Sequence, residues 1–181
     1  MSILPRLGSL TSLPALEHLD LLAEPVSRAL TDWEYAAQVG VVAIDPAVAA
    51  TAAMAAAYDL PMTCGANCVV VAGKRAGEER VATCLVRADT RADVNNLVKR
   101  SLDVRKCSFL PMDRAVAESY MEFGGITPVG LPAGWRLLVD TAVLDIEVAV
   151  IGSGLRRSKL LVPGVLLGQL PGAEVVDGLA G

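Results

Sequence analysis

The chain has 181 residues, of which 53% are hydrophobic, with a mean hydropathy of +0.48 and a formal net charge of −4. This length fits one domain, which buries about 70% of the surface that its unfolded chain would expose. The acidic balance argues against non-specific binding of nucleic acid over the whole surface, but it leaves room for a local basic site.

The most apolar region, over residues 39–60, is too interrupted to cross a membrane. Asp45, Pro46 and Asp59 break it, and no run reaches the roughly 18 apolar residues that a span needs. Residues 1–22 lack the charged start, apolar block and cleavage site of a secretory signal. We therefore expect a cytoplasmic protein without membrane association, in which the cysteines are reduced.

Prolines interrupt residues 1–30, which we predict to be an N-terminal extension to a single domain over residues 31–181. A short helix is expected within the extension, over residues 13–22. The branched apolar run at residues 39–44 then predicts a buried strand. Asp45 as N-cap and Pro46 at the first helical position predict an alanine-rich helix after it, which Pro61 stops.

The rest of the sequence alternates between short strands and short helices. Apolar runs predict strands over residues 68–72, 80–87, 106–110, 135–140, 148–152 and 159–162. Helices are expected over residues 93–102, 111–122 and 165–169, a turn over residues 73–78, a loop over residues 123–134, and a last short segment over residues 174–179. This order, with hairpins as well as crossovers, predicts an α+β (mixed α/β) fold. We expect a curled mixed β-sheet or partial barrel surrounded by short helices, and not a doubly wound parallel sheet.

Few residues suit conventional enzyme chemistry. The single histidine, His18, lies near the N-terminus, which argues against a Ser/His/Asp or Cys/His relay. Cys64 and Cys68 are close in sequence, but Cys84 and Cys107 stand alone, unlike the close pairs of zinc ligands. Neither a Gly-x-x-x-x-Gly-Lys-Ser/Thr phosphate loop nor a Gly-x-Gly-x-x-Gly motif after the first strand is present. We therefore expect neither a metal nor a cofactor.

Two basic clusters could contact phosphate or could simply be solvated faces. The first consists of Lys99, Arg100, Arg105 and Lys106, and the second of Arg156, Arg157 and Lys159. The pattern alone leaves both interpretations open.

Two glycine-containing segments are the strongest candidates for a functional site. Residues 123–131 read Phe-Gly-Gly-Ile-Thr-Pro-Val-Gly-Leu, and residues 150–154 read Val-Ile-Gly-Ser-Gly. Glycine permits positive φ and close approach of backbones, so a loop of this kind can direct several N–H groups at one oxygen, as an oxyanion hole does. Each segment by itself is also typical of a simple turn.

Together, in this order and at this spacing, the two segments resemble the YbaK/ProX family of aminoacyl-tRNA editing domains. That family has a Gly-Gly-Ile/Val-Ser/Thr-Pro-x-Gly loop after a helix, a strand ending in Asp, and later a Ser/Gly loop followed by a basic stretch and an apolar strand. The corresponding parts of this chain are residues 124–130, the strand that ends at Asp140, residues 152–154 and residues 155–162. The resemblance extends over about residues 40–172.

The resemblance implies a free-standing aminoacyl-tRNA deacylase, a trans-editing hydrolase that cleaves the ester of a small mischarged amino acid on tRNA. In such domains the glycine loop holds the ester through backbone groups, and the terminal ribose hydroxyl of the tRNA helps to place the attacking water. The loop residues implied as catalytic are Gly124, Gly125, Ile126, Thr127 and Pro128. The residues implied in substrate binding are Asn67, Gly130, Asp140, Gly152, Ser153 and Gly154. The expected partner is the aminoacylated 3′ end of tRNA and not DNA, and the apolar composition is compatible with a homodimer.

Asn67 departs from the pattern of the family. The family has a lysine in a segment like Ala-Lys-Thr-Leu, at the start of the strand after the first helix, where it contacts the substrate end of the tRNA. Asn67 can form hydrogen bonds but carries no positive charge, and Lys74 is expected in a turn. Two alternatives stay open: an editing fold that binds tRNA or a small aminoacyl ligand without turnover, and a cysteine-based enzyme centred on Cys64.

Overall fold

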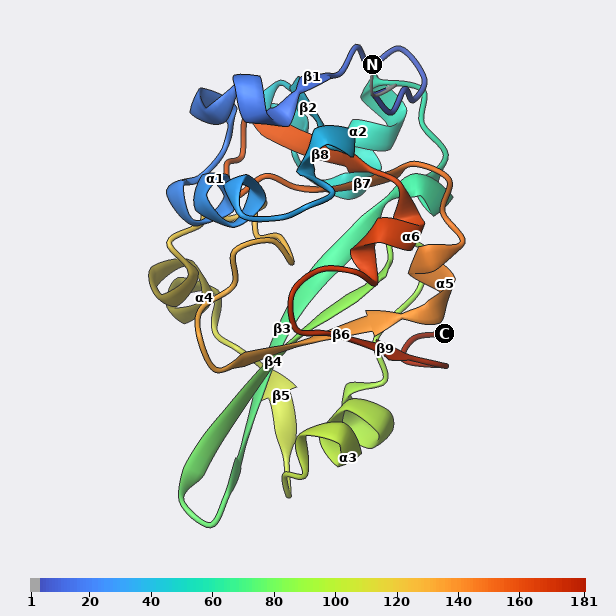
Figure 1. The fold of residues 1–181 in the computed structure, drawn as a ribbon. Coiled ribbons are helices and arrows are strands. Elements are labelled where there is room, and N and C mark those ends of the chain that lie inside the picture. The colour runs from blue at the N-terminus through green and yellow to red at the C-terminus, as the bar shows by residue number, and fades with distance from the viewer. Residues whose placement is uncertain (1–3) are drawn as a thin grey trace.

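A computed structural model describes residues 4–181, and its strands are divided between two sheets (Figure 1). The first sheet is antiparallel throughout, in the order β1 (Leu13–Pro14), β2 (Gly40–Ala43), β8 (Ser158–Val162) and β7 (Ala149–Gly152). The second has the order β5 (Cys107–Phe109), β3 (Ala66–Arg75), β4 (Glu78–Arg87), β6 (Trp135–Asp140) and β9 (Ala173–Val176). It is antiparallel from β5 to β4 and parallel from β4 to β9. The predicted α+β class is thus confirmed, and the described strands form two sheets instead of a closed barrel.

The helices are short, as the sequence predicts. They are α1 (Glu24–Thr31), α2 (Thr51–Ala57), α3 (Lys99–Leu102), α4 (Met112–Ser119), α5 (Thr141–Leu144) and α6 (Gly164–Leu167). Within residues 4–181, no helix has the length and apolar character that crossing a bilayer requires. Asp45 caps as expected, but on a 3₁₀ turn (Pro46–Val48) that precedes α2. Asp93 caps a π-helical turn (Val94–Val98) that continues into α3.

Several parts of the chain differ from the sequence-based expectation, among them α5, which was not expected. Residues 13–22 form β1 and two 3₁₀ turns instead of a helix, because Leu13 and Pro14 pair with β2. The turn between β3 and β4 contains only Ala76 and Gly77, whose positive φ angles allow a tight hairpin. Helix α1 was not expected, although Pro25 in its first turn is a helix-start signal.

The largest buried cluster joins the two sheets to α1. Val26 and Leu30 of α1 are fully buried against residues of both sheets, including Leu160 of β8 and Val139 of β6. The sheets also touch directly, where Gly65 forms a parallel bridge with Val150. This junction brings the start of β3 beside β7, and the β3–β4 hairpin extends from it to the far end of the molecule (Figure 1).

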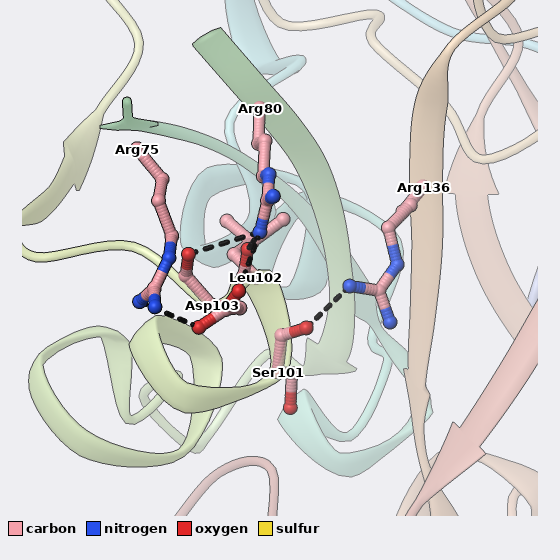
Figure 2. Close-up of polar contacts among 6 residues, drawn as sticks. All are labelled: Arg75, Arg80, Ser101, Leu102, Asp103 and Arg136. Carbon is pink, nitrogen blue, oxygen red and sulfur yellow. Dashed lines mark hydrogen bonds and ion pairs between the residues drawn. The ribbon is translucent and has the colours of Figure 1, made fainter. Parts of the chain in front are cut away.

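Arginines of the second sheet hold the C-terminal end of α3 (Figure 2). Arg80 of β4 donates hydrogen bonds to the carbonyls of Leu102 and Asp103, both at 2.9 Å. Arg136 of β6 donates to the carbonyl of Ser101. The last carbonyls of a helix have no partner within it, so these side chains supply the missing donors.

We predict that Arg80→Met lowers the free energy of unfolding by about 1–2 kcal/mol, because two carbonyls lose their donor. The matched control is Arg75→Met. Arg75 makes only an exposed ion pair with Asp103, at 2.8 Å, so its loss should cost less than about 1 kcal/mol. Urea unfolding of both variants measures the difference, and equal losses would contradict the proposed capping role of Arg80.

Candidate functional site

A cavity of about 330 Å³ lies where the two sheets meet. Its walls come from α2 and the residues before it, the segment from Leu60 into β3, the loop after α4, and the ends of β7 and β8. Among the described residues that line it, Thr51, Asn67 and Lys159 alone carry side-chain nitrogen or oxygen atoms. The cavity is therefore mainly apolar, with a few polar groups and exposed backbone.

The cavity brings together predicted site residues from three separate segments. Asn67 comes from β3, Gly124 and Ile126 from the glycine loop, and Gly152 from the end of β7. The other predicted residues are not among those that line it: Gly125, Thr127, Pro128, Gly130, Asp140, Ser153 and Gly154. Several of these instead hold the two glycine turns in place.

The two glycine turns, residues 122–126 and 152–155, pack backbone against backbone. The N–H of Gly154 donates to the carbonyl of Gly125 at 2.8 Å, and the N–H of Glu122 donates to the carbonyl of Gly154 at 2.8 Å. A Cβ atom on Gly152 would lie 2.3 Å from the carbonyl oxygen of Gly125. A Cβ atom on Gly125 would lie 2.8 Å from the carbonyl carbon of Gly154. The close approach thus requires glycine at positions 125 and 152.

Gly124 and Ile126 of the first turn both line the cavity. Gly124 has a φ of +78°, in the left-handed region that favours glycine. Neither N–H group donates to another backbone carbonyl in the part of the chain that the structure describes. Amides of this kind can bind an ester carbonyl or the oxyanion that forms from it.

Predicted residues outside the cavity have structural partners. The buried carboxylate of Asp140 accepts hydrogen bonds from the N–H groups of Ala142, at 2.8 Å, and Ala180, at 2.6 Å. The buried hydroxyl of Ser153 lies 2.7 Å from that of Ser158.

Two further residues of the glycine loop, Thr127 and Gly130, are not among those that line the cavity. Gly130, with a φ of +76°, packs closely against the carbonyl of Pro25. Thr127 is fully buried, and its hydroxyl has no hydrogen-bond partner among the described residues.

Asn67 joins two walls of the cavity. Its Oδ1 atom accepts a hydrogen bond from the hydroxyl of Thr51, the first residue of α2, at 2.8 Å. Lys74 lies near the far end of β3, is exposed, and does not line the cavity. No positive charge therefore enters the cavity from β3.

Lys159 of β8 supplies a positive charge that sequence analysis assigned only to a basic cluster. The residue is 9% exposed and lines the cavity, and its Nζ atom donates to the carbonyl of Gly124 at 3.0 Å. Burial, and then the charge of Arg156, lower the pKa of Lys159 to about 8. A lysine within an otherwise apolar strand is the signal that could have identified it.

The thiols in the cavity are poor nucleophiles. Cys64 and Cys68 both line it, and burial raises the pKa of each thiol above its ordinary value. A cysteine nucleophile reacts as the thiolate, which a raised pKa disfavours. The lone His18 is not among the lining residues, so the cavity does not favour the cysteine-based alternative. Within residues 4–181, no three His, Cys, Asp or Glu side chains are grouped so as to hold a metal ion.

An aromatic ring and a guanidinium group lie side by side at the edge of the cavity. Phe123 is 58% exposed, and the guanidinium of Arg156 lies 5.4 Å from the centre of its ring. Nε of Arg156 also donates to the carbonyl of Pro46 at 3.0 Å, and the backbone N–H of Arg156 donates to the carboxylate of Glu122 at 2.6 Å. Through these contacts, Arg156 connects the loop after α4 to the 3₁₀ turn before α2.

Comparison with known proteins gives one family match, to the family described as "Aminoacyl-tRNA editing domain", over residues 45–168. No curated protein matches the chain. The matched region contains both glycine turns, Asn67 and Lys159.

Three solved structures, each 20–21% identical to this chain, share its fold. A protein proposed to be a trans-editing enzyme for prolyl-tRNA synthetase gives a TM-score of 0.72, with 20% identity over 86% of this chain and 94% of that chain. A scaffold protein from computational epitope grafting gives 0.72, with 21% identity over 86% and 95%. The hypothetical protein APE2540 gives 0.68, with 21% identity over 78% and 90%. The family match covers more than half of the chain and confirms the resemblance seen in the sequence, so the chain belongs to the family of aminoacyl-tRNA editing domains.

Proposed function

We propose that the protein is a free-standing deacylase that removes a small mischarged amino acid from the 3′ end of tRNA. At the level of its family, the chain is an editing domain, a hydrolase that acts on aminoacyl-tRNA. The observation that carries the finer proposal is the meeting of both glycine turns and Asn67 at one mainly apolar cavity.

The cavity suits hydrolysis of an ester without an ionisable base. In the proposed reaction, the N–H groups of Gly124 and Ile126 bind the ester carbonyl, and a water placed by the terminal ribose hydroxyl attacks its carbon. The bond from that carbon to the ribose oxygen then breaks, which gives a free amino acid and a tRNA with its terminal hydroxyl restored. The described lining residues include no Asp, Glu or His, in keeping with a mechanism that depends on the substrate's own hydroxyl.

The size and polarity of the cavity favour a small side chain without positive charge. A volume of about 330 Å³ must hold part of the terminal ribose as well as the amino acid. The walls near α2 carry Ala49, Met54 and Ala55, and β7 adds Val150, so this part is apolar. An amino acid that fits beside the ribose is thus small, and a positively charged side chain there would be desolvated without a carboxylate partner.

The exposed Phe123 and the partly exposed Arg156 at the edge of the cavity suit binding of the 3′ end of the RNA. Single-stranded RNA is commonly bound by stacking of its bases on aromatic rings and by basic side chains that contact its phosphates. Phe123 offers the ring and Arg156 the charge, next to the turn that would hold the ester. We expect the terminal base to stack on Phe123.

Deacylation of a panel of mischarged tRNAs tests the proposed function directly. We expect turnover with a small amino acid and little with a large or positively charged one. Asn67 in place of lysine supports a second candidate, an editing fold that binds without turnover. Measurable tRNA binding with no turnover on any member of the panel would favour this second candidate over the first.

Gly152→Ala is expected to reduce kcat/KM at least tenfold. Its Cβ atom would lie 2.3 Å from the carbonyl oxygen of Gly125, so the two turns must separate and move the amides of the loop. The matched control is Gly168→Ala, where the atoms within 3.4 Å of the new Cβ are ends of the Leu144 and Val175 side chains. Activity is measured on folded protein, checked by thermal unfolding. Full activity of Gly152→Ala would show that the joined turns are not needed.

Phe123→Ala is expected to raise KM for aminoacyl-tRNA about tenfold with little change in kcat, because stacking of one base contributes about 1–3 kcal/mol. Phe109→Ala is the matched control, since Phe109 is 68% exposed and does not line the cavity. Steady-state kinetics with one mischarged tRNA gives both parameters. An equal effect of the two substitutions would refute a specific stacking role for Phe123.

A further inference from the structure

Lys159 lies between the two glycine turns, although its strand follows both of them in the sequence. In the register of β7 and β8, Lys159 is directly opposite Gly152. Its side chain then reaches the first turn, where Nζ donates to the carbonyl of Gly124 at 3.0 Å. The ammonium group is thus fixed beside the backbone that lines the cavity.

The ammonium group of Lys159 has donors to spare. It carries three N–H groups, and the carbonyl of Gly124 takes one of them. None of the ion pairs among the described residues includes Lys159. A buried cation without a carboxylate partner strongly favours an incoming group that carries negative charge.

We propose that Lys159 is a catalytic residue, whose ammonium donates a hydrogen bond to the carbonyl oxygen of the bound aminoacyl ester in place of a lysine on β3. This inference rests on the proposed deacylase function. During attack by water, the electron pair of the carbonyl moves onto its oxygen, and the ammonium stabilises the negative charge there. When the bond from the carbon to the ribose oxygen breaks, the electron pair on the oxyanion re-forms the C=O bond. The ribose oxygen then takes up a proton from the attacking water. Lys159 stays protonated throughout.

The burial of Lys159 distinguishes its proposed role in catalysis from binding of a tRNA phosphate. A tRNA phosphate stays near solvent at the edge of the cavity, where the partly exposed Arg156 lies beside Phe123. Lys159 is 9% exposed and lies in the wall, where the ester must enter. The two basic residues thus have different partners: Arg156 the RNA backbone, and Lys159 the reacting group.

The groups around Lys159 allow a clear pH signature. Arg156 adds positive charge, the carboxylate of Glu122 is bound to the N–H of Arg156, and the thiols of Cys64 and Cys68 stay neutral because their pKa values are raised. The pKa of Lys159, lowered to about 8, keeps the group mainly protonated at pH 7. Above pH 8 it loses its proton, and stabilisation of the oxyanion is lost with it.

Kinetics of Lys159→Met, Lys159→Arg and Arg156→Gln tests the proposal, with the rate of spontaneous ester hydrolysis subtracted. We expect Lys159→Met to lower kcat about a hundredfold, without changing the salt dependence of KM. Arg156→Gln should instead raise KM and reduce its salt dependence, as loss of a phosphate contact does. An unchanged kcat in Lys159→Met, with wild-type protein active, would overturn the role of Lys159 and leave the deacylase function intact. If the wild-type protein deacylates none of the mischarged tRNAs, both the role of Lys159 and the deacylase function are overturned.

The pH profile of the wild-type protein needs no substitution and so does not depend on folding of a variant. We expect kcat to be constant below pH 8 and to fall above it, and Lys159→Arg, which keeps its charge, to remove the fall. Persistence of the fall in Lys159→Arg would assign it to the substrate's amino group and refute the proposal. Asn67→Lys added to Lys159→Met should restore part of kcat, because residue 67 lines the same cavity.

Discussion

The close contact between the two glycine turns is the constraint on which the cavity depends. Hydrogen bonds between Gly125, Gly154 and Glu122 hold the turns together, at distances that leave no room for a side chain at position 125 or 152. Because the first turn is fixed in this way, Gly124 and Ile126 face the cavity and leave their amides without backbone partners. A loop held by backbone contacts can keep its donors aimed without reorganisation, which is what stabilisation of an oxyanion requires.

The segment before the family match supports the second turn from behind. The N–H of Ala23 donates to the carbonyl of Ser153 at 3.1 Å, and the hydroxyl of Ser158 donates to the carbonyl of Leu21 at 2.6 Å. Gly154, with a φ of +83°, packs so tightly on Ala23 that a Cβ atom would lie 2.3 Å from the methyl group. Residues that precede the matched region thus help to position the turn that holds the first one.

A cation can reach the cavity from more than one strand. The start of β3 meets β7 at the bridge of Gly65 with Val150, and β8 pairs with β7 on its other side. Side chains from β3 and β8 therefore enter the same space, although Asn67 and Lys159 are far apart in the sequence.

The sequence by itself determined the positions of most strands and the family. β6 has the predicted bounds of residues 135–140, and Asp45 and Asp93 cap turns where they were expected, because capping depends on residues only a few positions apart. The glycine segments were also recognisable from the sequence, because each of them consists of a few consecutive residues. Only the tertiary structure decided that the strands form two sheets and that Lys159 lines the cavity while Thr127 does not. The direction in which a side chain points is set by the register and packing of strands distant in the sequence, and no local pattern encodes that.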